Sequence, residues 1–142
     1  MAETVGARRR RPRPAITHDN AFFWEGIAAG TLLLQRCRCG RLRHPPGPVC
    51  PACHSFEWEA VPASGRGRVY SFAVAHHPAI PPFEYPNPIG LVELEEGPRI
   101  VANLVGVAPD AIRIGMPVTC EIVEVEEGFR LPRFRPAEGG RS

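Results

Sequence analysis

The sequence has no lysine: all 17 of its basic residues are arginine. It also lacks any apolar run close to the roughly 18 residues needed to cross a bilayer. No apolar segment follows the basic N-terminus, as one would in a signal peptide. These absences predict a cytoplasmic protein with no membrane span. Because the net charge is only +2, the chain as a whole does not require a polyanionic partner.

Residues 1–16 are rich in arginine and proline and poor in apolar side chains. The arginines at 8–11 repel one another, and Pro12 and Pro14 oppose helix formation, so we expect an extended or disordered arm. Such an arm is a solvated tail or interdomain linker, or alternatively a nucleic-acid-binding segment. Residues 137–142 form a second, shorter tail.

Residues 17–30 predict one short helix, capped at its start by Thr17 or Asp19 and ended by Gly30. The helix carries three consecutive aromatic side chains: Phe22, Phe23 and Trp24. So wide an aromatic stripe exceeds what one face of a short helix buries. The helix must therefore dock on the rest of this chain or on a partner.

Residues 61–136 predict a domain made of strands and turns. Strand-like runs cover residues 67–75, 89–94, 99–105, 118–126 and 129–134. Glycine-containing hairpin turns join some of them at 95–98 and 126–129, and a short helical turn occupies 108–116. Five strands with one non-hairpin connection favour a closed barrel, because closure removes exposed edges. The sequence therefore predicts a mainly β protein that ends in a five-stranded OB-fold barrel.

Alternation along these strands also predicts which side chains are buried. Tyr70 and Phe72 share a strand face with Val74, which places both aromatic residues in the core. Cys120 is in register with apolar neighbours on its strand, so we expect a small buried hydrophobic residue.

The loop "HHPAIPPFEYPNP" (76–88) is too long and too rich in proline for a plain hairpin. Since proline lowers the entropy of the free loop, this segment is prepared to bind a partner. Together with the three helix aromatics, its predicted contact residues are His76, His77, Phe83 and Tyr85. The two histidines beside Glu84 and Tyr85 also allow acid–base chemistry. No nucleophile motif or carboxylate pair accompanies them, so no catalytic residue is assigned.

Four of the five cysteines are spaced as Cys37-x-Cys39, ten residues, then Cys50-x-x-Cys53. Two close pairs separated by a short β-rich span are typical of a zinc ribbon, here residues 31–60, in which four thiolates surround one Zn²⁺. This segment has few apolar residues of its own, and structural zinc contributes about 10 kcal/mol or more to the folding of such units.

Other roles for the four cysteines remain open but fit less well. Two disulfides are unexpected in a chain without an export signal. A redox pair belongs in a βαβ unit that is not visible here, and an iron centre or a site that has lost its metal are the remaining alternatives. His44 and His54 neighbour the cysteines and are expected to be surface residues. A closed four-cysteine site has no open position for a substrate, so its metal would be structural.

Several motifs occur in a fixed order between residues 17 and 136: "FFWEG", "LQRCRCGRLRHPPGPVCPAC", "GRGRVYSFAVAHH", "GLVELEEGPRIVANLVGV", "IRIGMPV" and "LPRFRP". In this order they resemble the zinc-ribbon and OB-fold family long labelled domain of unknown function 35. The resemblance implies a non-catalytic accessory subunit that forms a hetero-oligomer with a thiolase-superfamily enzyme. That complex handles CoA thioesters, and the accessory subunit supports the folding or activity of its partner or the transfer of intermediates.

The segment "RPRPAITHDNAFFWEG" is similar to one branch of the family, which occurs as the C-terminal domain of a hydratase-fused subunit in bacterial steroid side-chain degradation. There the partner is a lipid-transfer-protein-like aldolase, and a two-plus-two assembly follows by analogy with thiolase dimers. The chain departs from the family pattern at the first cysteine pair, which is usually Cys-x-x-Cys-Gly. The shorter Cys37-x-Cys39-Gly40 predicts a tighter, strained loop.

Two other functions remain open. OB-fold barrels often bind single-stranded nucleic acid through aromatic platforms in a basic groove, but residues 64–136 carry seven arginines against nine acidic residues. An enzyme acting alone would depend on the histidines of the 76–88 loop. Arginines on the barrel could also meet CoA phosphates, although the sequence does not select among Arg68, Arg99 and Arg113.

Overall fold

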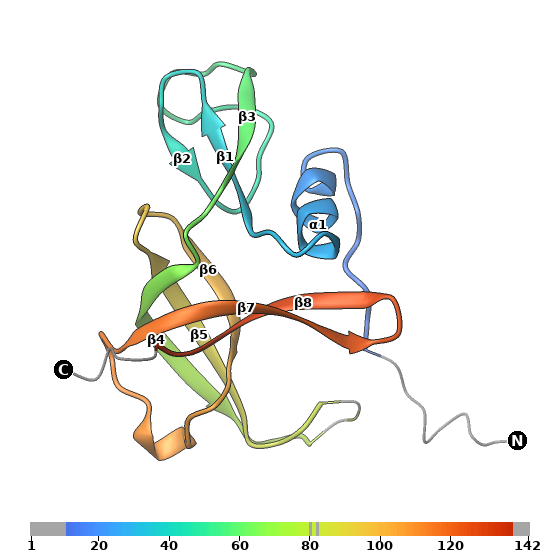
Figure 1. Ribbon diagram of the computed structural model, residues 1–142, viewed down its shortest axis with the longest axis vertical. Coiled ribbons are helices and arrows are strands. Elements are labelled where there is room, and N and C mark those ends of the chain that lie inside the picture. The colour runs from blue at the N-terminus through green and yellow to red at the C-terminus, as the bar shows by residue number, and fades with distance from the viewer. Residues whose placement is uncertain (1–10, 80, 82, 138–142) are drawn as a thin grey trace, which may run out of the picture.

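The computed structural model describes residues 11–79, 81 and 83–137 (Figure 1). Its elements are α1 (Ala21–Ala28), β1 (Leu33–Cys37), β2 (Leu42–Arg43), β3 (Trp58–Pro62), β4 (Arg66–Ala75), β5 (Asn87–Leu94), β6 (Arg99–Leu104), the 3₁₀ helix η2 (Pro109–Ala111), β7 (Pro117–Glu126) and β8 (Phe129–Pro136). Part of the predicted N-terminal arm (1–10) and most of the predicted tail (138–142) lie outside the described residues. No helix within the described ranges is long and apolar enough to span a membrane.

The strands form two units (Figure 1). A small antiparallel sheet has the order β2-β1-β3, and five strands close into a barrel in the order β4-β5-β6-β8-β7. All barrel pairs are antiparallel except β6 and β8, where Asn103 lies opposite Arg133 and Leu104 opposite Phe134. This arrangement confirms the predicted mainly β fold with an N-terminal helix, a ribbon and a five-stranded barrel.

The predicted turns occur where the sequence placed them. The β5–β6 and β7–β8 connections fall at 95–98 and 127–128, and η2 lies inside the predicted helical turn at 108–116. The barrel strands therefore start and end within three residues of their predicted limits.

The helix is shorter than predicted. It begins at Ala21 with Asn20 as its N-cap, and no side chain caps it. Thr17 and Asn20 instead bond to each other's backbone N–H groups, which forms a separate turn ahead of the helix. The expected capping by Thr17 or Asp19 is therefore wrong. Gly30 follows the helix in a left-handed conformation (φ 90°), so the predicted end is confirmed.

The helix, ribbon and barrel share one apolar core. Phe23 and Ile27 of α1, Leu34 of β1, and the barrel residues Val92 and Phe134 belong to the same buried cluster. The helix packs so closely on β1 that a Cβ at Gly26 would lie 2.7 Å from a Leu33 methyl carbon. The three units therefore hold fixed positions relative to one another, which defines the surface between them.

Tyr70 is not a core residue, although alternation along the strand predicts it. The β4–β5 register shifts between Val69 and Ser71, so Tyr70 is a bulge residue whose side chain is 46% exposed. The guanidinium carbon of Arg99 lies 3.7 Å from its ring centroid. Phe72 packs against the core as predicted, because the bulge reverses the inward and outward positions.

The described part of the N-terminal arm lies against the barrel. The backbone N–H of Arg11 donates to Glu126 Oε2 (2.9 Å), and Arg13 Nη1 donates to Glu126 Oε1 (2.6 Å). Both guanidinium groups also lie over aromatic rings, that of Arg11 at 5.3 Å from the Phe83 centroid and that of Arg13 at 4.2 Å from the Phe129 centroid. Residues 11–16 of the predicted arm are extended, and the state of the arm as a whole stays a prediction.

A cluster of charged side chains on β7 and β8 predicts that the stability of the fold depends on pH. Glu121 accepts hydrogen bonds from Arg135 and Arg133. The bond from Arg135 contributes most, and together with the bond from Arg133 and the charges of both arginines it lowers the pKa of Glu121 to about 2. Burial acts in the opposite direction. A lowered carboxyl pKa stabilises the fold above the ordinary pKa, and this contribution is lost as the pH falls towards 2. We expect Glu121→Gln to cost about 1 kcal/mol at pH 7 and progressively less below pH 4.

Urea unfolding of wild type and variant across this pH range measures the difference. Glu127→Gln is the matched control, because the Glu127 side chain is exposed. A cost for Glu121→Gln that stays constant down to pH 2.5 would contradict the assigned ion pairs.

Candidate functional site

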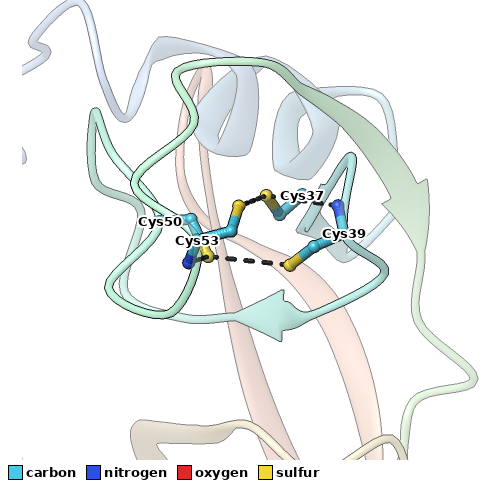
Figure 2. A group of neighbouring side chains, drawn as sticks. All are labelled: Cys37, Cys39, Cys50 and Cys53. Carbon is cyan, nitrogen blue, oxygen red and sulfur yellow. Dashed lines mark hydrogen bonds between the residues drawn. The ribbon is translucent and has the colours of Figure 1, made fainter.

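The four clustered cysteines come together at the tip of the small sheet (Figure 2). Cys37 ends β1, Cys39 lies in the following turn, and Cys50 and Cys53 belong to the loop before β3. Their sulfur atoms all lie within 4.8 Å of one another, with 3.4 Å between Cys37 and Cys53 and 3.8 Å between Cys39 and Cys50. Ligand sulfurs on a tetrahedral zinc ion, at about 2.3 Å from the metal, lie about 3.8 Å apart. The cluster has the size that one such ion requires.

The backbone around each pair turns its N–H groups towards sulfur. Cys39 N lies 3.5 Å from Cys37 Sγ, and the N–H groups of Ala52 and Cys53 lie 3.4 and 3.5 Å from Cys50 Sγ. Gly40 closes the shortened first pair with φ 94°, a conformation that costs glycine little. The one residue missing from this pair therefore does not keep its two sulfurs out of the cluster.

The thiols of the second pair differ in acidity. The hydrogen bond from the backbone N–H of Cys53 makes the largest contribution to lowering the pKa of Cys50, which falls to about 6. Although Ser55 acts to lower the pKa of Cys53, the neighbouring thiols and burial raise it to about 11. In the absence of a cation, the four groups cannot all be thiolates at neutral pH. A divalent ion would remove that limit by binding all four sulfurs.

The arginines near the cluster are mostly engaged elsewhere. Arg36 pairs with Glu59 across the β1–β3 ladder, and Arg38 with Glu57 at 3.3 Å. Arg43 is half-buried and donates to the Gly47 carbonyl at 2.9 Å. These contacts join β1 to β3 and hold the ribbon loop at Gly47.

Gln35 fixes the ribbon loop that precedes the second pair. Its side chain is 1% exposed, its Nε2 donates to the Gly47 carbonyl (3.1 Å), and its Oε1 accepts from the Gly47 N–H (2.9 Å). We expect Gln35→Met to cost about 2 kcal/mol, because the Gly47 N–H would be left without its partner. Urea unfolding of the two proteins measures this. Equal stability would show that the loop is held by other contacts.

A second candidate site is an apolar groove of about 620 Å³ between the three units. We call it the central groove. Its walls come from α1 (Phe23, Trp24), the ribbon loop (His44, Pro46), the 76–88 loop (Phe83, Tyr85) and the outward faces of β5 and β6 (Ile89, Val101). Four of the seven predicted partner-contact residues therefore line one surface, although some sixty positions separate the helix from the loop.

The other predicted contact residues lie elsewhere. Phe22 packs on Trp58, with 4.6 Å between ring centroids. His76 and His77 are exposed and do not line the groove. Phe23 is only 5% exposed, so most of its surface is used inside the chain. Among the described residues, no hydrogen bond or ion pair joins the two histidines to Glu84 or Tyr85, as the acid–base alternative would need.

His44 is not the surface residue that the sequence predicts. It is half-buried, and its ring centroid lies 5.1 Å from that of Phe23. Burial lowers its pKa, so the imidazole is neutral at pH 7. His54 is exposed as predicted, with a positive φ of 63°. Cys120 is partly buried against the core, which raises the pKa of its thiol to about 11.

The strand wall of the groove was not predicted from the sequence. Outward positions of a small barrel are usually polar, yet Ile89, Leu91 and Val101 face outward here, and Val101 is 66% exposed. The signal was present in "IGLVEL", which is apolar at both inward and outward positions up to Glu93. A strand that is apolar on both faces indicates that something covers its outer side.

Comparison with family models matches two adjacent regions of the chain. Residues 24–59 match the ChsH2 rubredoxin-like zinc ribbon domain, and residues 60–123 match the ChsH2 C-terminal OB-fold domain. The boundary between the two matches lies within β3, in the sheet that leads into the barrel.

Three curated relatives are similar over most of this chain. A probable enoyl-CoA hydratase alpha subunit of Thermomonospora curvata is 57% identical over 89% of the chain, and the 3-oxo-4,17-pregnadiene-20-carboxyl-CoA hydratase alpha subunit of Mycobacterium tuberculosis is 45% identical over 89%. The chain spans 40% of the length of each of these two. The benzoylsuccinyl-CoA thiolase subunit BbsA of Thauera aromatica is 34% identical, with 80% of both chains covered.

A solved structure of the Ltp2–ChsH2(DUF35) aldolase contains a similar chain. It superimposes with a TM-score of 0.85 at 56% identity, covering 87% of this chain and 98% of that one. The similarity therefore extends over most of the fold.

Proposed function

The chain belongs to the ChsH2-like DUF35 family of zinc-ribbon and OB-fold proteins, and we propose that it is a non-catalytic accessory subunit of a thiolase-superfamily enzyme. The observation that carries the proposal is the correspondence over 98% of a chain from the Ltp2–ChsH2 aldolase. The partner supplies the catalytic residues, and this chain supplies a rigid binding surface.

The substrate class follows from the names of the relatives. A pregnadiene carboxyl-CoA and a benzoylsuccinyl-CoA are both CoA thioesters whose acyl groups carry rings. We propose that the partner acts on a thioester of this class, as an aldolase that cleaves a steroid side chain. The hydratase activity named for two relatives belongs to proteins of which this chain matches only two fifths of the length.

We further propose that Cys37, Cys39, Cys50 and Cys53 hold one structural Zn²⁺. Four thiolates complete a tetrahedron, so the ion offers no position to a substrate. When bound, it would fix the ribbon loop that carries His44 into the wall of the central groove. Its contribution to the complex is therefore to keep the binding surface in shape.

Affinity capture from a nuclease-treated lysate of the source organism tests the proposal. We expect one thiolase-superfamily protein, identified by mass spectrometry, at a stoichiometric ratio to the tagged chain. Capture of DNA or RNA in untreated lysate, lost at moderate salt and without such an enzyme, would favour single-stranded nucleic acid binding instead. Against that alternative, the exposed Tyr70 ring is already covered by Arg99.

A further inference from the structure

The central groove has the properties of a ligand site rather than of ordinary protein surface. Its volume of about 620 Å³ lies within the range of 300–1,000 Å³ that holds one small molecule. None of its lining side chains is charged, although 23% of the chain is Asp, Glu or Arg. An uncharged surface of this size favours an uncharged occupant, because a buried charge would find no partner there.

The walls of the groove suit a flat ring system. Aromatic side chains stand on two sides, Phe23 and Trp24 from the helix and Phe83 and Tyr85 from the 76–88 loop. The outward side chains of β5 and β6 add an aliphatic surface that includes the exposed Val101. Aromatic rings bind flat apolar groups by stacking or by edge contacts, with little loss of side-chain entropy.

The polar groups in the groove are few and neutral. Asn103 Nδ2 donates to Asn87 Oδ1 (2.7 Å) and to the Pro88 carbonyl (3.0 Å). Within the described residues, the two asparagine side chains form no other hydrogen bond. Asn103 Oδ1 and Asn87 Nδ2 are therefore available to a ligand. With the neutral imidazole of His44, they can pair with keto or hydroxyl groups but cannot neutralise a phosphate.

We propose that the central groove binds the uncharged, ring-bearing acyl group of the CoA thioester on which the complex acts. The CoA part stays outside, because its phosphates would meet no cationic side chain in the groove. The accessory subunit thereby contributes to substrate binding as well as to the support of its partner. This inference rests on the proposed function for the presence of such a thioester.

Tryptophan fluorescence of the purified chain tests the site directly. The chain has two tryptophans, and Trp58 does not line the groove, so a Trp58→Phe background leaves Trp24 as the reporter. Progesterone is the probe, as an uncharged ring system with keto groups. We expect a saturable change with a Kd in the micromolar range. Decanoate, a charged chain without rings, is expected to give none.

A pair of matched variants ties the signal to the groove. Val101 (66% exposed) lines it, whereas Ile114 (64% exposed) lies outside it. We expect Val101→Glu to weaken progesterone binding at least tenfold and Ile114→Glu to leave it unchanged. No saturable change in the Trp58→Phe background, or equal weakening by both variants, would overturn the inference.

Capture of the partner by the same two variants separates this inference from the proposed function. If progesterone does not bind but Val101→Glu loses the captured enzyme, the groove accommodates a segment of the partner, and only the ligand inference fails. If the wild-type chain captures no thiolase-superfamily enzyme, the proposed function fails, and with it the assignment of an acyl group as the occupant.

Discussion

Replacement of Cys50 by serine is expected to abolish stoichiometric zinc binding and to unfold the ribbon. Cys50 is fully buried, accepts two backbone N–H groups and lies 3.8 Å from the sulfur of Cys39. Serine cannot provide a thiolate, and the remaining sulfurs would leave an incomplete tetrahedron. Since structural zinc contributes about 10 kcal/mol or more to such units, the loss exceeds what the few apolar contacts of the ribbon can replace.

Two measurements and a control variant check this prediction. Elemental analysis should give about one zinc per wild-type chain and much less for Cys50→Ser. Hydrogen exchange should show lost protection at the β1 amides, while the barrel amides stay protected. Cys120→Ser is the control, because it removes a thiol that lies outside the cluster. A Cys50→Ser protein that keeps one zinc and full β1 protection would contradict the four-cysteine site.

The barrel could be predicted from local rules, and the one core position predicted wrongly, Tyr70, depends on strand pairing. Glycine turns and alternating side chains gave five strands, because inward and outward positions repeat every two residues. The bulge at Tyr70 adds one residue and reverses that alternation for the remainder of β4. Nothing in "RVYSF" marks the extra residue, since it depends on how β4 pairs with β5.

The cysteine cluster could also be predicted, because the spacing of the four cysteines along the chain largely determines it. The central groove could not. It forms where the helix, the ribbon loop, the 76–88 loop and four barrel strands meet, and this depends on their shared core. The sequence identified aromatic residues that needed a partner, yet it left open whether each one packs inside the chain or remains available.

The sequence did not show which aromatic residues of the helix pack inside the chain. In the structure the three have different environments. Phe23 enters the core, Phe22 packs on Trp58, and Trp24 stays half-buried beside the groove. A helix of eight residues has little stability by itself. Its position therefore depends on the side chain that enters the core.

Substitution of Phe23 by alanine is accordingly expected to cost about 3–4 kcal/mol of folding free energy. Phe23 is 5% exposed, and its ring contacts those of Trp24 and His44, each at 5.1 Å between centroids. Its removal would leave a cavity between helix and ribbon and take away one wall of the groove. We expect the helix amides to lose protection from hydrogen exchange and progesterone binding to weaken at least tenfold.

Phe56→Ala is the matched control for this prediction, because Phe56 is 75% exposed. Its urea unfolding should lie within about 0.5 kcal/mol of wild type. If Phe23→Ala costs no more than Phe56→Ala, the helix does not pack on this chain in the way described. Loss of the captured partner in that same variant would then mean that the helix docks on the partner, the other possibility that its aromatic stripe allows. A large loss of stability in the isolated chain would instead show that Phe23 is needed within this subunit before any partner binds.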